Sequence, residues 1–101
     1  MTRLVVTADA EADTREILLF LEREVGREVA ARYGQRFRLI LQRLVELPET
    51  GAPRPILGPN SRIGIVSPYV LIYDFVHEDD LVVLLRLLHG RRNITRDLLQ
   101  R

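Results

Sequence analysis

The sequence has no cysteine and no lysine, and it has no apolar run long enough to cross a membrane. Without cysteine, disulfide scaffolds, thiolate zinc sites and cysteine nucleophiles are excluded. The longest apolar runs are the size of a strand, far below the ~18 residues of a membrane-spanning helix. The first residues, Met1 to Val6, are too short and too strand-like for a signal peptide. These absences together predict a cytoplasmic protein.

The absence of lysine means that all 15 basic residues are arginine, although the formal net charge is only +1. Two explanations are open. Arginine forms planar, bidentate contacts with carboxylates and phosphates, which lysine cannot form, whereas a GC-rich genome also favours arginine. The low net charge argues against a general nucleic-acid binder, and we expect no direct sequence-specific binding of nucleic acid.

The residues that are present are typical of a small folded protein. The chain has 101 residues, of which 47% are hydrophobic and 29% charged, and this composition indicates a globular rather than a disordered chain. This length corresponds to one domain with one modest core. We therefore expect residues 1–101 to form a single domain.

The first half of the sequence predicts a strand followed by a helical hairpin. Leu4–Thr7 has the pattern of a short strand, and either Thr7 or Asp9 can cap the helix that follows. Apolar residues recur at helical spacing up to Gly26, and again from Ala30 to Leu47, after which a proline ends the second helix. Because the connection at Gly26 is short, the two helices are expected to be antiparallel.

The second half predicts a loop and then an antiparallel meander. Residues 48–61 contain four prolines and two glycines, a composition typical of loops. Three strands are expected at 62–66, 69–76 and 81–88. Tight turns at Ser67-Pro68 and at 77–80 join them, and a short terminal helix is expected over Ile94–Gln100.

The predicted fold class is therefore α+β. An N-terminal strand and an α-helical hairpin precede an antiparallel β-sheet, the hairpin packs on one face of that sheet, and a short C-terminal helix follows. The N-terminal strand is expected to pair with one of the later strands, and the other face of the sheet is expected to be partly open.

Arg86 lies within the last, otherwise apolar strand. A buried cation must reach an edge, a partner or a ligand. If the last two strands pair symmetrically about the turn at 77–80, Arg86 lies opposite Leu71, on the face that also carries Tyr69 and Tyr73. An arginine among aromatic residues on an open face can grip a peptide or a nucleotide, or it can simply snorkel along an apolar surface.

His89, Arg91 and Arg92 form a dense cationic corner after the last strand. Such a corner binds phosphate or an acidic protein surface in some proteins, and in others it caps carbonyls or pairs with nearby acids. His89 can donate a proton, although a histidine at the end of a strand is more often structural.

A second group of arginines, Arg32, Arg36 and Arg43, shares one face of the second helix. This spacing is typical of a solvated face. The first helix is acidic, because residues 1–30 carry seven acids and four arginines, so pairing across the hairpin is the alternative.

No pattern of residues predicts a catalytic centre, a metal site or a cofactor. The run His77–Asp80 has metal-ligating residue types, but four consecutive residues cannot converge on one ion, and their polarity suits a turn. Ser61 and Ser67 lack the sequence context of a nucleophile, and no glycine-rich phosphate loop occurs.

Four short segments nevertheless stand in a characteristic order and spacing: Thr7–Ala10, Leu44–Gly51, Tyr69–Tyr73 and His89–Arg92. In this combination the chain resembles, over nearly its whole length, the ParE-like branch of the RelE/ParE toxin superfamily of bacterial type II toxin–antitoxin systems. The resemblance implies the fold predicted above. It also implies a cognate antitoxin, ParD-like or similar, whose C-terminal segment wraps the toxin and covers apolar grooves and basic patches.

The superfamily has two activities, and the resemblance bears on which one applies. RelE-like members cleave mRNA in the ribosome with lysines and arginines near the sheet, and some use a C-terminal tyrosine, whereas ParE-like members are known for poisoning DNA gyrase. This chain has no lysine and no tyrosine after Arg92. It also has Val70 where the nuclease branch has an arginine, and valine can neither stabilise a phosphate nor move a proton.

These departures favour a ParE-like toxin that inhibits DNA gyrase by binding and does no chemistry of its own. The residues expected to contact gyrase are His89, Arg91 and Arg92, with the tail from Ile94 to Arg101. The residues expected to contact the antitoxin are Arg86, Tyr69, Tyr73, Arg32 and Arg36.

Two alternatives remain at this point. In a metal-independent mRNA endonuclease, Arg62, Arg86, Arg91 and Arg92 would hold the scissile phosphate and His89 would act as acid or base. In an inactive member, the chain would only bind its antitoxin and regulate transcription through it.

Overall fold

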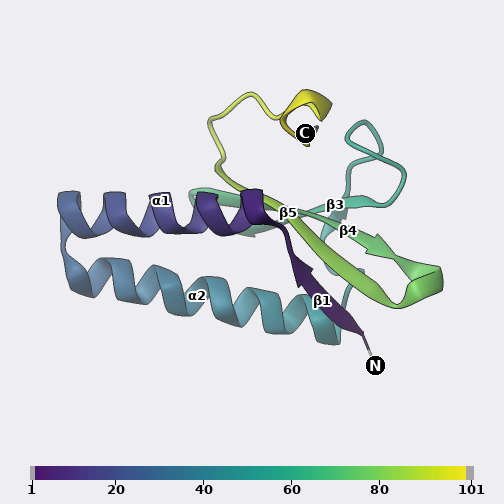
Figure 1. Cartoon of the computed structure of the whole chain (residues 1–101), viewed down its shortest axis with the longest axis horizontal. Coiled ribbons are helices and arrows are strands. Elements are labelled where there is room, and N and C mark those ends of the chain that lie inside the picture. The colour runs from purple at the N-terminus through teal and green to yellow at the C-terminus, as the bar shows by residue number, and fades with distance from the viewer. Residues whose placement is uncertain (1, 100–101) are drawn as a thin grey trace.

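The computed structural model describes residues 2–99 and shows two long helices packed against a five-stranded sheet (Figure 1). The elements, in chain order, are β1 (Arg3–Val6), α1 (Ala8–Val25), α2 (Arg27–Glu46), β2 (Ala52–Pro53), β3 (Ser61–Val66), β4 (Tyr69–Val76), the 3₁₀ turn η1 (His77–Asp79), β5 (Leu81–His89) and the 3₁₀ turn η2 (Arg96–Leu99). The α+β class predicted from the sequence is confirmed.

The helical hairpin begins and turns where local sequence signals predict. Thr7 caps α1, because its Oγ1 accepts a hydrogen bond from the Ala10 amide at 3.1 Å. Gly26 ends α1 with a φ of 101°, a conformation that favours glycine, and its amide donates to Leu21 O. α2 then returns antiparallel to α1 and presents Phe37 and Leu44 to the core.

The sheet has the strand order β1-β5-β4-β3-β2. β3, β4 and β5 pair antiparallel, as the meander predicts, and β1 pairs with a later strand as expected. The short β2, which the sequence does not predict, pairs antiparallel with β3. That later strand is β5, and the pairing is parallel, from Arg3 opposite Leu81 to Val6 opposite Leu84. The sheet is therefore mixed rather than wholly antiparallel.

A β-bulge in β5 overturns the predicted register of Arg86. Near the turn the symmetric pairing holds, with Tyr73 opposite Leu84, but Leu85 then has no partner and Arg86 lies opposite Ile72 instead of Leu71. A bulge adds one residue to one strand only, so every later side chain of β5 changes face relative to the simple register. Arg86 therefore lies on the face opposite to Tyr73.

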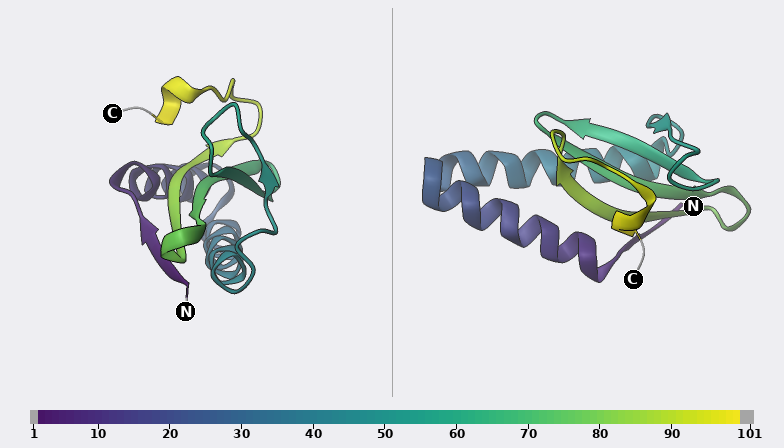
Figure 2. Two further views of the ribbon diagram at one scale, coloured as in Figure 1. Left: turned by 90° about the vertical axis from the view of Figure 1, so that its right-hand side faces the viewer. Right: turned by 90° about the horizontal axis from the view of Figure 1, so that it is seen from above.

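Side chains are buried on both faces of the sheet. The face toward the helices holds the larger core, which includes Phe37, Leu71, Tyr73 and Leu84. The far face holds a smaller cluster of Leu57, Ile72 and Leu88, against which Ile94, Leu98 and Leu99 pack. Figure 2 shows this C-terminal segment on the side of the sheet away from α2. The far face is thus more covered than the sequence predicts.

The loop and the C-terminal segment lie where their composition predicts, but their bounds differ slightly from the prediction. The proline-rich stretch 48–61 is mostly loop, but it contributes the short edge strand β2, and β3 begins within it at Ser61. The predicted terminal helix is only the four-residue turn Arg96–Leu99, and its expected last residue, Gln100, lies outside the described residues. Neither of the two long helices combines the length and apolarity that crossing a membrane requires.

Candidate functional site

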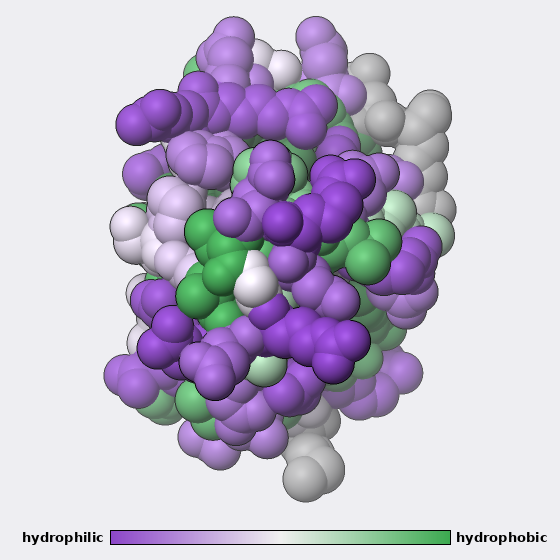
Figure 3. Space-filling view, turned by 90° about the vertical axis from the view of Figure 1, so that its left-hand side faces the viewer, coloured by the Kyte–Doolittle hydropathy of each residue, from purple (hydrophilic) through white to green (hydrophobic). Residues whose placement is uncertain are grey.

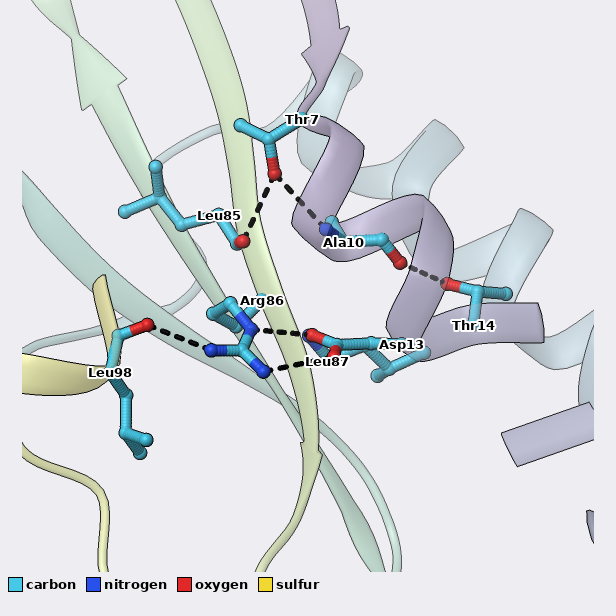
Figure 4. Close-up of polar contacts among 8 residues, drawn as sticks. All are labelled: Thr7, Ala10, Asp13, Thr14, Leu85, Arg86, Leu87 and Leu98. Carbon is cyan, nitrogen blue, oxygen red and sulfur yellow. Dashed lines mark hydrogen bonds and ion pairs between the residues drawn. The ribbon is translucent and has the colours of Figure 1, made fainter. Parts of the chain in front are cut away.

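Arg86 reaches an internal carboxylate on α1 (Figure 4). Its Nε donates to Asp13 Oδ2 at 2.7 Å, and its Nη2 donates to Asp13 Oδ1 at 2.9 Å. The two side chains are only 16% and 12% exposed, respectively. A two-pronged contact between guanidinium and carboxylate is among the strongest hydrogen-bonded pairs in proteins. This bonding to Asp13 raises the pKa of Arg86 above its usual value, so the side chain stays charged.

The same pair ties three parts of the chain together. The Leu87 amide donates to Asp13 Oδ2 at 3.0 Å, and Arg86 Nη1 donates to Leu98 O at 2.8 Å. At the N-cap of the same helix, Thr7 Oγ1 donates to Leu85 O at 3.0 Å. Because β1 pairs with β5 only as far as Leu84, Thr7 and Asp13 supply polar partners for Leu85 O and the Leu87 amide beyond that point.

Arg86 thus needs no ligand to satisfy its charge. The general expectation, that a cation among apolar residues must find a partner, is confirmed, but Asp13 is that partner and no snorkelling occurs. The expected contact with an antitoxin rested on an unengaged cation, and this cation is engaged. Contact of Arg86 with an antitoxin therefore stays a prediction, and the guanidinium nitrogens that would make the contact are already bonded within the chain.

Tyr69 and Tyr73 lie under the helical hairpin, not on an open sheet face as expected. Tyr73 has 0% exposure, and its hydroxyl donates to Pro48 O at 2.7 Å and accepts from the Gly51 amide at 2.9 Å. Tyr69 is 6% exposed. Burial raises the pKa of both tyrosines. Neither side chain presents a substantial surface to a partner, so any part they play in antitoxin capture is indirect.

His89, Arg91 and Arg92 remain at the surface, as predicted from the sequence. Three backbone contacts shape this corner. The Gly90 amide donates to Pro68 O at 2.8 Å, the Arg91 amide to His89 Nδ1 at 3.1 Å and the Arg92 amide to His89 O at 3.0 Å. The guanidinium groups of Arg91 and Arg92 have no ion pair with any residue in the range 2–99. They are available to an external anion. Arg101, the last residue of the predicted tail, is outside the described range.

Arg32 and Arg36 are likewise exposed on α2. The pairing with the acidic helix that the sequence left open is not seen for either of them within residues 2–99, and the exposed hairpin pair is Arg27 with Glu22 at 3.9 Å. Arg36 instead stacks over the ring of Tyr33 at 5.2 Å. Figure 3, which views the molecule from the side of the hairpin turn, shows a mainly hydrophilic surface with small apolar patches.

A line of ring contacts joins the two exposed sets. Tyr33, under Arg36, packs edge-on against Tyr69 at 5.6 Å, and Tyr69 packs edge-on against His89 at 5.7 Å. The sequence assigned Arg36 to the antitoxin and His89 to gyrase. The structure places these residues at the two ends of one continuous group of side chains.

An apolar groove of about 420 Å³ lies between α2 and the strands β2 and β3, at one edge of the sheet. Ile40, Leu44 and Ile63 line it together with Arg43 and Arg54. Ile65, which also lines the groove, is 66% exposed. An apolar surface flanked by cations suits an amphipathic, acidic segment of a partner protein.

Two of the arginines expected in a nuclease site, Arg62 and Arg86, point to opposite faces of the sheet. Arg62 lies opposite Tyr73 and therefore on the helix-facing side of the sheet, whereas Arg86 lies opposite Ile72 on the other side. Arg62 Nη1 donates to Glu49 O at 2.9 Å and to Gly51 O at 2.8 Å, so it holds the turn after α2. The run His77–Asp79 forms the predicted turn. Within residues 2–99 no group of three metal-ligating side chains meets.

Asp13 is the residue that sequence reasoning missed. The signal for it was present, because a buried strand arginine needs a carboxylate and the first helix is rich in acids. The one that pairs, however, is 73 positions away in the sequence, and only the packing of α1 beside β5 selects it.

Comparisons with known proteins agree with the fold and with each other. A family model described as the ParE toxin of the type II toxin–antitoxin system parDE matches residues 4–94. The chain is 31% identical over 98 residues to Toxin ParE3 of Caulobacter vibrioides, which covers 97% of this chain and 96% of that protein.

Three solved structures share the fold. A chain of the chromosomal ParDE system from P. aeruginosa has a TM-score of 0.73 and 23% identity, with 88% of this chain and 96% of that chain covered. The isolated E. coli RelE toxin has a TM-score of 0.58 and 18% identity, with coverage of 92% and 88%. A chain of the intact E. coli RelBE toxin–antitoxin complex has a TM-score of 0.60 and 18% identity, with coverage of 91% and 100%.

Proposed function

Because the chain belongs to the ParE toxin family of type II toxin–antitoxin systems, we propose that it inhibits DNA gyrase by binding and that a cognate, ParD-like antitoxin neutralises it. The proposal treats residues 1–101 as one toxin domain that acts in the cytoplasm, where gyrase is found. It assigns no chemical step and no cofactor to the toxin.

The observation that carries the choice between binding and catalysis is the placement of the arginines. Holding a scissile phosphate requires several cations around one point. Arg62 and Arg86 lie on opposite faces of the sheet, and each is engaged with groups of its own chain. This arrangement supports a toxin that acts through its surface.

The surface proposed for gyrase is the corner at His89, Arg91 and Arg92, with the tail from Ile94 onward. Both guanidinium groups are exposed beside a strand end whose backbone is held by hydrogen bonds. A partner that offers carboxylates or phosphates would meet preformed donors there.

The surface proposed for the antitoxin comprises Arg32 and Arg36 on α2 and the adjoining apolar groove between α2 and β3. The exposed apolar side chains of Leu39 and Ile65 extend it. A segment that folds on binding can cover an apolar groove and reach flanking cations at the same time.

Induction of the toxin alone in a bacterial host tests the target. If gyrase is inhibited, DNA-damage signalling and filamentation should follow, and co-expression of the antitoxin encoded beside it should restore growth. Immediate arrest of translation with cleaved mRNA would instead support an endonuclease. Normal growth would support an inactive member that only binds its antitoxin.

A supercoiling assay with purified gyrase tests the surface. The double variant R91E/R92E should weaken inhibition at least about tenfold, because each lost charge-assisted contact typically contributes about 1.5–3 kcal/mol. The matched control is R15E/R23E on α1, which changes the charge by the same amount at two exposed positions. Equal loss in both variants would point to net charge, and no loss in either would remove the corner from the proposal.

A further inference from the structure

The C-terminal segment (residues 90–99) has little structure of its own. Its regular part is the 3₁₀ turn Arg96–Leu99, in which the Leu98 amide donates to Thr95 O at 3.1 Å. Ile94, Leu98 and Leu99 pack on the far-face cluster and are each half-buried. A segment with so few internal bonds keeps its place only through contacts with the rest of the chain.

The polar contact at the far end of this segment is made by Arg86. Its Nη1 donates to Leu98 O at 2.8 Å while Nε and Nη2 are both held by Asp13 (Figure 4). Asp13 is held in turn by the Leu87 amide. Because a guanidinium group is planar and rigid, fixing one side of it on Asp13 also fixes the direction of the donor that meets Leu98.

The near end of the segment is anchored separately. The Gly90 amide donates to Pro68 O at 2.8 Å, and the Arg92 amide donates to His89 O at 3.0 Å. The exposed cations Arg91 and Arg92 therefore stand between two anchors. One is the end of β5, and the other is the contact from Arg86 to Leu98.

We propose that Asp13 and Arg86 are positioning residues for target recognition: they hold Leu98, and through it the segment that carries Arg91 and Arg92, in the geometry that binds the target. The assignment of gyrase as that target rests on the function proposed above. Neither Asp13 nor Arg86 touches the target. They act by ordering the segment before binding, so that the complex does not have to bear the entropic cost of ordering it.

This role differs from ordinary stabilisation of the fold. The main core lies on the opposite face of the sheet and is built from α1, α2 and the helix-facing strand residues. A change at this pair also weakens the tie of α1 to β5, but the main core should keep the hairpin and the sheet in place while residues 90–99 loosen. Local order and global stability can then be measured separately.

The test uses the full chain with Arg86→Lys, read by amide hydrogen exchange and by gyrase supercoiling. Lysine keeps a charge beside Asp13, but a single ammonium group cannot reproduce the rigid fork that reaches both Asp13 oxygens and Leu98 O. Exchange of the Leu98 amide and of the other hydrogen-bonded amides in residues 90–99 should rise about tenfold or more, because a hydrogen bond to a charged group typically contributes at least about 1.4 kcal/mol, a factor of ten in an equilibrium constant. The toxin concentration for half-inhibition should rise by a similar factor.

Two further variants make the result specific. Asp13→Asn keeps an oxygen for the Leu87 amide but weakens the hold on the guanidinium, so it should reproduce the effect, and the double variant should be no worse than either single one. Arg62→Lys is the matched control. It also releases carbonyl contacts of a strand arginine, but on the opposite face, and it should change neither exchange in 90–99 nor inhibition.

The outcomes separate this inference from the proposed function. Unchanged exchange in residues 90–99 for both R86K and D13N overturns the positioning role, whatever gyrase does. Faster exchange with unchanged inhibition overturns it as well, because the order of the segment then does not matter for binding. Wild-type protein that leaves gyrase unaffected overturns the proposed target, and the exchange data then still decide whether the pair holds the segment.

Discussion

Tyr73 shows how one buried hydroxyl can organise a turn. It lies in the middle of β4 with no exposed surface, and its hydroxyl bonds Pro48 O and the Gly51 amide. A Cβ at Gly51 would collide with the Tyr73 hydroxyl and would lie 2.7 Å from Tyr73 Cε1. Only glycine therefore fits beneath this ring.

Replacing Tyr73 with phenylalanine should therefore destabilise the fold. The change leaves two backbone groups without their partner, and such unsatisfied groups cost about 1–3 kcal/mol. Denaturant unfolding measures the loss. The control is Tyr33→Phe, at a half-buried ring whose hydroxyl makes no hydrogen bond among residues 2–99, and it should change the free energy of unfolding by less than about 0.5 kcal/mol. Equal effects would mean that the bonds to Pro48 and Gly51 contribute nothing.

Tyr73 should also give the protein a dependence on alkaline pH. Burial raises the pKa of this hydroxyl above the ordinary value of 10.0, against a smaller lowering by the bond to Gly51. The neutral form is thus favoured in the folded state. Its contribution to stability is complete below the unfolded pKa and is lost as pH rises through the folded pKa.

The pH dependence is measured by comparing wild type with Y73F. Between about pH 9 and about pH 11 the wild type should lose more free energy of unfolding than the variant, because the variant lacks the titrating group. Tyr69, whose pKa is also raised, is present in both proteins and cancels in the difference. Parallel curves for the two proteins would contradict the prediction.

At the scale of elements, two glycines of the helical hairpin, Gly26 and Gly34, should respond in opposite ways to replacement by alanine. Gly26 has a φ of 101° and a ψ of 166°, and a Cβ there would meet nothing within 4 Å. Any cost of Gly26→Ala is therefore backbone strain, which for this region amounts to about 1–3 kcal/mol. Gly34 is an interior residue of α2, and a Cβ there would lie 3.8 Å from Leu18 Cδ1, an ordinary contact.

Gly34→Ala should therefore stabilise the protein by about 0.5–1 kcal/mol, the usual difference between the two residues within a helix. Thermal or denaturant unfolding of the two variants measures both signs in one experiment. Stabilisation by both would mean that the turn at Gly26 relaxes freely, and destabilisation by both would mean that the contact of α1 with α2 is tighter than these distances indicate.

The elements themselves could be predicted because their signals are local. Apolar spacing and the residues Thr7 and Gly26 define the helices, and the turns at 67–68 and 77–80 define the meander. The bulge at Leu85 could not be predicted, because leucine there is no different from its neighbours and the irregularity depends on how β5 packs. The same holds for the parallel pairing of β1, which depends on where the hairpin returns the chain.

The candidate site divides in the same way. Exposure of His89, Arg91 and Arg92 follows from their position after the last strand and was predicted. The burial of Tyr73 and the engagement of Arg86 were not, because both depend on which face each side chain occupies, and a one-residue change of register reverses that. Long-range partners such as Asp13 are decided by tertiary packing alone.

At the scale of the whole molecule, the net charge of +1 conceals an uneven distribution. α1 carries acids, of which Asp9, Asp13 and Glu16 all act favourably on Arg86, whereas Arg36 and the cationic corner remain open to solvent. Attraction of an acidic partner is therefore local. It should weaken as salt screens charges over about 10 Å at 0.1 M ionic strength.

With the function proposed above, this arrangement predicts that antitoxin and gyrase compete for the toxin. Arg36 and His89 stand at the ends of one continuous group through Tyr33 and Tyr69, so a partner segment that covers α2 also crowds the corner beyond it. The toxin concentration that half-inhibits gyrase should rise in proportion to the antitoxin added. A pull-down of gyrase, toxin and antitoxin should recover no ternary complex. The control variant R32E/R36E should bind antitoxin more weakly. It should therefore need more antitoxin for the same relief of gyrase inhibition. A stable ternary complex with gyrase still inhibited would show that the two surfaces are independent, since competing ligands cannot occupy one surface together.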